Sequence, residues 1–318
     1  MRARVRASQP IVREMTDTQR EWTIDRPGES RLHVRTWEDP AARAVVCVAH
    51  GLGDHAGRFE RVGRALSARG IAVHSLDLPG HGKSGGPRGH IRGWSEFYGA
   101  LAALIERVCP EGNARPLGLI GHSMGALVAL DWALAHPSRT RALVLSAPPF
   151  ELAMKPIIFK VWLARIAEQV VPALTQANQI PPSLLSHDPE VIRAHRRDPL
   201  VHHRVSARLY LEYVRNRRRL YGSAGKLAVP TLVIQGGADP VASAPAAERW
   251  AGSAAPGRTT LRLYPGLYHE VLNEYEGPAI LAELAAWMEA RLLGGEAGPA
   301  PPSSRAPDAP APTGGSAA

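Results

Sequence analysis

The amino-acid sequence predicts an α/β fold, in which helices flank a mainly parallel central sheet and a helical cap is inserted into the chain. Three observations support this fold class. Short apolar runs typical of buried strands alternate along the chain with segments of helical periodicity. One junction between such a strand and such a helix carries the motif GHSMG. The alternation also stops once, between residues 150 and 221, where helical patterns occur without a convincing strand.

Each element is predicted from its local pattern. The segment 22–38 has alternating residues on both sides of a Pro-Gly pair, which predicts two strands joined by a turn. Short apolar runs predict buried strands at 44–50, 71–78, 117–120 and 141–147, and strands that run into loops at 229–239 and 259–266. Apolar residues spaced three and four apart predict helices at 59–69, 94–108, 124–136 and 278–293.

These elements divide the chain into an α/β core, an insertion and two terminal segments. The insertion splits the core into two parts, and the composition of each terminal segment differs from that of the core. The predicted parts are a loose N-terminal arm (1–18), the first part of the core (19–149), the helical cap or lid (150–221), the second part of the core (222–293) and a Pro/Ala/Gly-rich tail, expected to be disordered (294–318).

Charge, cysteine content and hydropathy limit the classes of protein to which the chain can belong. The 318-residue chain has a formal net charge of +9, but most of its basic residues are arginines and no nucleic-acid-binding motif accompanies them, so we expect no nucleic-acid partner. Its only cysteines, Cys47 and Cys109, form no disulfide framework and no CxxC motif. No apolar run approaches the ~18 residues of a membrane span, and the N-terminus lacks the apolar core of a secretory signal. A cytoplasmic protein is the expectation.

The motif GHSMG contains the first candidate catalytic residue. Gly121 and Gly125 flank Ser123 where the strand ends and the helix begins. A G-x-S-x-G sequence in this context is typical of a nucleophile elbow, a sharp turn that raises a serine above the carboxyl edge of the sheet. The glycines avoid clashes where backbones come close. The turn also places the amide of Met124 at a helix N-terminus, where unpaired N–H groups favour an anion.

A serine nucleophile needs a base and a group that orients the base. Asp239 follows the apolar run TLVIQ, and His269 follows the run TLRLY. In a parallel sheet both loops lie at the edge where Ser123 is expected. The order Ser, Asp, His is also the one found in proteins with this type of elbow. We therefore predict Ser123, Asp239 and His269 as a catalytic triad.

An oxyanion hole needs a second backbone donor besides Met124. The sequence HGLGDH follows the predicted strand 44–50, and its Gly51 and Gly53 would let the backbone approach a substrate. We assign the second donor to the amide of Leu52.

Six ordered blocks extend these single observations. They are HGLGDHAGRFE, DLPGHGKSGGPRGHI, GHSMGALVAL, LSHDPEVIRAHRRDPLVHHRVSARL, GGADPVAS and YHEVLNE. On these blocks the chain, over about residues 20 to 290, resembles the monoacylglycerol lipase and lysophospholipase group of α/β-hydrolases, often labelled serine aminopeptidase-like hydrolases. One departure is Ala126, where members of that group usually have glycine.

The resemblance implies an α/β-hydrolase fold with a helical cap over a hydrophobic acyl pocket. It carries over the triad and the two oxyanion donors proposed above, and it implies neither a metal ion nor an organic cofactor. The substrate would be a small lipid ester, most simply a monoacylglycerol cleaved to glycerol and fatty acid. A lysophospholipase with the same triad, an acyltransferase and a non-catalytic binding protein with a hydrolase fold are the alternatives.

The cap carries the remaining candidates. The segment 156–174 is mostly apolar, and its Ile157, Ile158, Val161 and Trp162 are candidates for the wall of the acyl pocket. Either it packs as an ordinary cap helix, or it also contacts a membrane or lipid surface transiently. The segment 193–220 is strongly basic, which fits a solvated face or attraction to an anionic headgroup.

Overall fold

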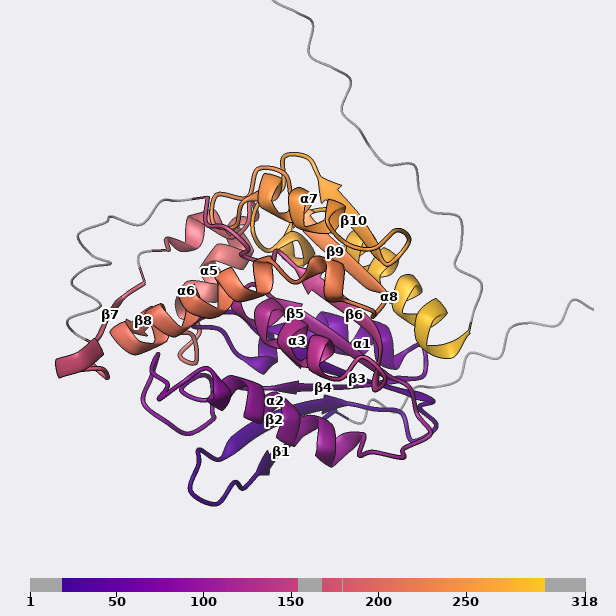
Figure 1. Ribbon diagram of the computed structural model, residues 1–318, viewed down its shortest axis with the longest axis horizontal. Helices are drawn as coiled ribbons and strands as arrows, with labels where there is room; N and C mark the ends of the chain where they lie inside the picture. The colour runs from indigo at the N-terminus through magenta and orange to yellow at the C-terminus, as the bar shows by residue number, and fades with distance from the viewer. Residues whose placement is uncertain (1–18, 154–167, 179, 295–318) are drawn as a thin grey trace, which may run out of the picture.

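The computed structural model describes residues 19–153, 168–178 and 180–294. Its centre is an eight-stranded sheet (Figure 1). The strands of this sheet are β1 (Gln19–Ile24), β2 (Leu32–Trp37), β3 (Ala44–Ala49), β4 (Ile71–Leu76), β5 (Leu117–His122), β6 (Thr140–Ser146), β9 (Thr231–Gly236) and β10 (Thr259–Tyr264). Their order is β1-β2-β4-β3-β5-β6-β9-β10. β2 alone runs against the direction of the other strands of this sheet, which confirms the predicted mainly parallel sheet.

Helices cover both faces of the sheet because its strands are apolar on both sides. On β3, Val45 and Cys47 belong to the core under one helical layer, whereas Val46 and Val48 belong to the core under the other. The first layer contains α2 (Ser95–Val108), α3 (Met124–Ala135) and α7 (Ala244–Gly252), and the second contains α1 (Glu60–Ser67) and α8 (Gly277–Leu293). Short 3₁₀ helices lie at Ala56–Phe59 (η1), Pro182–Leu184 (η2), Ala224–Lys226 (η3) and Val271–Asn273 (η4).

The strand order places a topological switch between β3 and β5. After β3 the chain passes through α1 to β4 on one side, and after β4 it passes through α2 to β5 on the other side. The loops that leave the carboxyl ends of β3 and β5 therefore diverge and leave a crevice between them, which is where ligands bind in open α/β sheets. These are the loops that contain HGLGDH and GHSMG.

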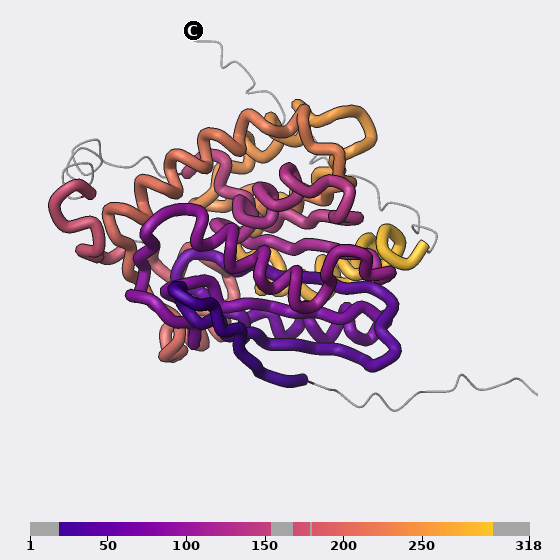
Figure 2. The backbone as a smooth tube through the Cα atoms, turned by 60° about the horizontal axis from the view of Figure 1, so that its bottom comes forward, coloured from indigo at the N-terminus to yellow at the C-terminus, as the bar shows by residue number. Residues whose placement is uncertain are grey.

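The insertion between β6 and β9 differs from the prediction in one respect. Its described part contains the expected helices α5 (Pro189–Arg197) and α6 (Ala207–Tyr221). It also contains a short antiparallel pair, β7 (Thr175–Ala177) with β8 (Arg204–Ser206), so the prediction of a purely helical insertion was wrong. In Figure 1 and Figure 2 the insertion lies at the opposite end of the molecule from the last turn of α8.

Several predictions fall on residues outside the described ones. They concern the N-terminal arm 1–18, the tail from 295 onward, and the four cap residues proposed for the acyl pocket, Ile157, Ile158, Val161 and Trp162. Among the helices that the structure does describe, none is both long enough and apolar enough to span a bilayer.

Candidate active site

Ser123 occupies the sharp turn that joins β5 to α3. Its backbone has φ 51° and ψ −122°, a left-handed φ that is uncommon for a residue with a side chain. The amide of Ser123 donates to the carbonyl of Ser146 at 2.9 Å, which ties the turn to the end of β6. Strained backbone of this kind persists only where the surroundings impose it, and it concentrates at functional sites.

The two glycines of the motif are needed because backbones come into contact on both sides of the turn. A Cβ atom at Gly125 would lie 2.2 Å from the carbonyl oxygen of Ala49 and 2.4 Å from that of His50. A Cβ atom at Gly121 would lie 2.4 Å from the carbonyl oxygen of Gly125. The start of α3 thus packs directly on the end of β3, as the sequence motif predicted.

Asp239 lies in the loop after β9, buried and held by three donors besides the histidine. Its Oδ1 accepts from the amides of Val241 and Ala242 at 2.8 and 2.9 Å. Its Oδ2 accepts from Nε2 of Gln235 at 2.9 Å. These hydrogen bonds fix the carboxylate in one orientation, with Oδ2 directed toward His269.

His269 lies in the loop after β10, and its Nδ1 is 2.8 Å from Oδ2 of Asp239. Burial disfavours the imidazolium, but the carboxylate outweighs this effect and raises the pKa of His269 above its ordinary value. Burial would likewise raise the pKa of Asp239, yet the charge and hydrogen bond of His269 and two backbone amides hold it below its ordinary value. The pair can therefore take up a proton on the imidazole while the carboxylate remains charged.

A small cavity of about 50 Å³ brings the predicted residues together. Ser123, His269 and Leu52 all line it. Among the described residues, no hydrogen bond joins Oγ of Ser123 to the His269 ring, so the two side chains meet only across this cavity. Contacts of this kind often tighten only when a substrate is bound.

The predicted oxyanion donors are the amide of Leu52, which lines this cavity, and the amide of Met124, the residue after Ser123 at the start of α3. No hydrogen bond within the described part of the chain uses either amide. The loop that contains Leu52 lies against the nucleophile, since a Cβ atom at Gly51 would be 3.2 Å from Cβ of Ser123. The buried ring of His50 holds this loop, because its Nδ1 bonds the carbonyl of Gly51 at 2.7 Å and its Nε2 accepts from the amide of Leu78 at 2.9 Å.

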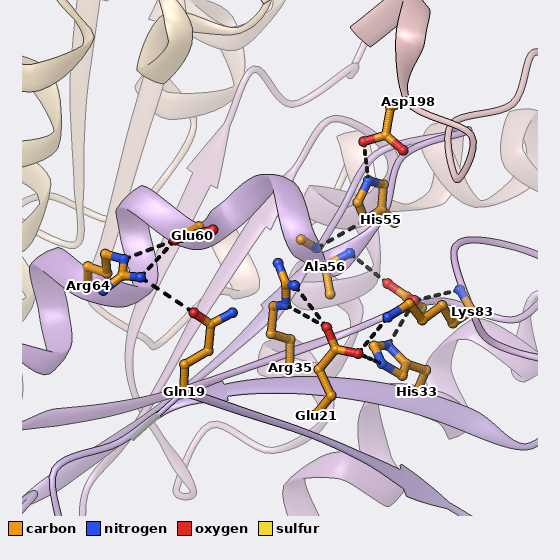
Figure 3. A network of polar contacts seen from close by, with 12 residues as sticks. Gln19, Glu21, His33, Arg35, His55, Ala56, Glu60, Arg64, Lys83 and Asp198 are labelled. Carbon is orange, nitrogen blue, oxygen red and sulfur yellow. Dashed lines mark hydrogen bonds and ion pairs between the residues drawn. The ribbon is translucent and has the colours of Figure 1, made fainter. Parts of the chain in front are cut away.

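A second support for the same loop was not predicted from the sequence. The amide of Ala56 donates to Oδ1 of the buried Asp77 at 2.6 Å, and His33 bonds Oδ2 at 3.0 Å. Burial alone would raise the pKa of Asp77, but His33 and two backbone amides lower it to about 2. Figure 3 shows His55 of this loop directed toward Asp198 of the cap, at 2.9 Å from Nε2 to Oδ2. The loop is therefore held from the core and from the insertion.

A buried ion pair forms another wall of the cavity. Arg58 donates to both carboxylate oxygens of Glu270 at 2.9 and 2.7 Å, and it also contacts Asp54 at 3.4 Å. Burial opposes the charge on Glu270, but Arg58 lowers the pKa of this carboxyl to about 2. His122 lies nearby, and burial together with the charge of His269 lowers its pKa to about 4, so its ring is neutral at pH 7.

Comparisons with known proteins identify the family to which the chain belongs. The family model described as serine aminopeptidase, S33, matches residues 40–276. The monoacylglycerol lipase of Mycolicibacterium smegmatis is 31% identical over 282 residues, which cover 87% of this chain and 100% of that protein. The phospholipase YtpA of Bacillus subtilis is 29% identical, with 76% of this chain and 93% of that protein covered.

A solved structure gives the same result for the fold. The crystal structure of the Paleococcus ferrophilus monoacylglycerol lipase superposes with a TM-score of 0.76 at 29% identity, over 82% of this chain and 99% of that one. The predicted α/β-hydrolase fold is thus confirmed. Because the family model spans most of the core, and the M. smegmatis relative is matched over its full length, the chain belongs to the serine aminopeptidase S33 family of α/β-hydrolases.

Proposed function

We propose that this hydrolase cleaves acyl esters with Ser123 as nucleophile, His269 as general base and Asp239 as the group that orients it. One observation carries the proposal: a buried His269–Asp239 pair opens onto the same cavity as a serine in a strained turn. The amides of Leu52, which lines that cavity, and of Met124, next to Ser123, have no hydrogen-bond partner among the described residues and would supply the two donors that an oxyanion needs.

In the proposed reaction Oγ of Ser123 attacks the ester carbonyl while Nε2 of His269 takes the hydroxyl proton. Asp239 holds the proton on Nδ1 and stabilises the imidazolium. The amides of Leu52 and Met124 donate to the carbonyl oxygen as it becomes negative. The bond to the leaving alcohol then breaks, and His269 returns the proton to that oxygen. Water, activated by His269, releases the fatty acid and restores Ser123.

Monoacylglycerol is the substrate that the cavity favours. The cavity wall contains the carboxylates of Asp54 and Glu270, and Arg58 is the only arginine or lysine among its described residues. That guanidinium is already engaged by both carboxylates. A phosphate group near Ser123 would therefore face more negative than positive charge, whereas the hydroxyl groups of glycerol would not.

His195 supports a polyol as the leaving group. Its ring is buried in the cavity wall, and its Nδ1 has no partner among the described residues. Burial lowers the pKa of His195, so the ring is neutral at pH 7. A neutral imidazole can both donate and accept, which suits a hydroxyl group of glycerol. A buried polar atom without a partner is costly unless a ligand or water satisfies it.

The basic segment of the cap does not change this preference. Arg208 and Arg215 both pair with Glu168, and Arg219 pairs with Asp131. None of these arginines lines the cavity beside Ser123. The paired arginines support the simpler interpretation of this segment as a solvated, salt-bridged face rather than a site for a phosphorylated headgroup.

The test compares fatty-acid release from a monoacylglycerol and from a lysophosphatidylcholine of equal chain length. We expect kcat/KM to be higher for the monoacylglycerol by about 10-fold or more, because like charges placed together cost several kcal/mol and each 1.4 kcal/mol is tenfold. Equal or faster release from the lysophospholipid would contradict the neutral-lipid proposal. Analysis of the products formed in the presence of added alcohols separates hydrolysis from acyl transfer. If the native protein bound lipid but released no fatty acid from either substrate, it would be a binding protein.

We also propose that the cap contacts lipid surfaces. Three large apolar side chains just before and beside the start of β7 are exposed: Val170 at 73%, Leu174 at 64% and Val171 at 45%. Exposed apolar side chains that lie close together mark interaction sites in soluble proteins. A peripheral contact of this kind is compatible with the cytoplasmic location expected from the sequence.

Vesicle binding tests this contact. Leu174→Asp should weaken co-sedimentation with phosphatidylcholine vesicles by about 10-fold, since burying one large apolar side chain contributes ~1.5–3 kcal/mol and tenfold in affinity is 1.4 kcal/mol. Ala114→Asp, at an exposed position between α2 and β5, adds the same charge and should leave binding unchanged. Equal binding of Leu174→Asp and the native protein would refute the contact.

A further inference from the structure

Glu274 is a buried carboxylate with no role in the proposed reaction. It directly follows η4 in the block YHEVLNE, and only 3% of the residue is exposed. Buried carboxylates require partners, because water no longer solvates their charge. The partners of Glu274 come from two segments that are far apart in the sequence, namely the loop that contains His269 and the cap.

Each oxygen of Glu274 has two donors. Oε1 accepts from the amide of Tyr268 at 2.8 Å and faces Nδ1 of His187 at 2.9 Å. Oε2 accepts from the amide of His187 at 2.8 Å and lies 3.1 Å from the hydroxyl of Ser186, which shares its one proton with the carbonyl of Asn273 at 2.9 Å. Both oxygens of the carboxylate therefore have partners in the cap. Glu274 therefore joins the cap segment 186–187 to the residue just before His269.

The residue just after His269 is tied to the same cap segment. The amide of Glu270 donates to the carbonyl of Leu185 at 2.8 Å. The ring of His187 also packs against the ring of Tyr268, with 3.8 Å between their centres. The backbone on both sides of His269 is thus held by residues 185–187 or by the carboxylate that binds them.

This arrangement affects the bond between His269 and Asp239. The aspartate is fixed separately, by donors from its own loop and from β9. The 2.8 Å contact from Nδ1 of His269 to Asp239 therefore depends on where the histidine loop is held. Misplacement by about 1 Å costs of the order of 100-fold in rate.

We propose that Glu274 is a positioning residue, which fastens the His269 loop to cap segment 185–187 and so keeps the imidazole in register with Asp239. The proposal rests on the function proposed above for His269. It extends that function by making the cap part of the catalytic alignment, in addition to any role in covering the substrate.

Glu274→Gln is the decisive variant. In this variant the NH₂ group of glutamine would replace one carboxylate oxygen and would face donors that now bond to that oxygen. At least one of these hydrogen bonds would therefore be lost. We expect kcat for a short p-nitrophenyl ester, normalised to sites titrated with a fluorophosphonate, to fall by roughly 10- to 100-fold while KM stays within about threefold. Glu289→Gln is the matched control, because Glu289 lies on α8 and pairs with Arg69 at the surface.

The pH dependence separates positioning from a merely structural role. Asp239 raises the pKa of His269. A loosened loop weakens that contact, so the acidic limb of kcat/KM should move to lower pH in Glu274→Gln. An NMR titration of the His269 ring should show the same lowering of its pKa, independently of activity. Loss of folded protein alone would change neither quantity in the titrated, folded fraction.

Ser186→Ala tests the cap side of the tie and remains informative if Glu274→Gln fails to fold. Ser186→Ala should lower kcat by roughly 3- to 10-fold. The double variant should have a kcat within about twofold of that of Glu274→Gln, as expected for residues that act through one contact. The proposal would be overturned if both single variants kept the kcat, the acidic limb of kcat/KM and the His269 pKa of the native protein. Failure of the proposed function would appear differently, as full activity in Ser123→Ala.

Discussion

Ser123→Ala is expected to lower kcat for ester hydrolysis by about 10⁴- to 10⁶-fold, because it removes the atom that forms the acyl-enzyme. Binding and the oxyanion donors would remain, so a small residual rate above that in water is expected. Labelling by a fluorophosphonate probe should be lost completely, since the probe reacts with the activated hydroxyl. Steady-state hydrolysis of a monoacylglycerol and gel-based labelling measure the two effects.

The fold should survive this substitution. Alanine has the same backbone restrictions as serine at the left-handed φ of this turn, and the structure already accommodates Ala147 at φ 45°. The melting temperature should therefore stay close to that of the native protein. Ser138→Ala, at an exposed position after α3, serves as the matched control and should keep full activity. Unchanged hydrolysis by a folded Ser123→Ala protein would refute the assignment of the nucleophile.

The residues of the proposed site could be selected from the sequence because they sit where strands end. The expected strand 117–120 and helix 124–136 correspond to β5 (Leu117–His122) and α3 (Met124–Ala135), so the turn between them was located correctly. Asp239 and His269 follow β9 and β10, which are adjacent in the sheet. Local patterns locate strand ends, and a parallel sheet brings the carboxyl ends of its strands to one edge.

Elements defined by distant partners were not predictable in this way. The strands β7 and β8 contain three residues each and exist only because they pair with one another across 26 intervening residues. The helix α7 (Ala244–Gly252) was also missed, since a short, alanine-rich segment without a strong apolar stripe carries little periodic signal. Its place is set by Trp250, which packs into the core over β9 and β10.

The supporting residues of the site were missed for the same reason. Asp77 and Glu274 occur in two of the sequence blocks described above, but the distant partners that they hold lie 21 and 87 residues away. Nothing in the local pattern shows which buried carboxylate will hold which loop. The candidate catalytic groups could be proposed from motif and topology, whereas the contacts around them required the tertiary structure.

Asp239→Asn should lower kcat by about 10⁴-fold while leaving the fold intact, because the orientation of the new amide is determined by its neighbours. The amides of Val241 and Ala242 must still find an acceptor, so the Asn oxygen would occupy the position of Oδ1. The Asn NH₂ group would then face Nδ1 of His269 and donate to it. The ring would carry its proton on Nε2, where it has to accept one from Ser123.

The pH dependence gives this prediction a direction as well as a size. In the native enzyme His269 must be neutral to act as a base, so kcat/KM should rise with pH through a pKa above the ordinary histidine value of 6.5. Without the carboxylate the imidazolium loses its partner, and the acidic limb should shift to lower pH even as the plateau falls. Asp131→Asn, which removes a carboxylate on α3 that pairs with Arg219, should alter neither. A limb that stays in place in Asp239→Asn would mean that another group titrates in the reaction, and it would remove Asp239 from the proposed mechanism.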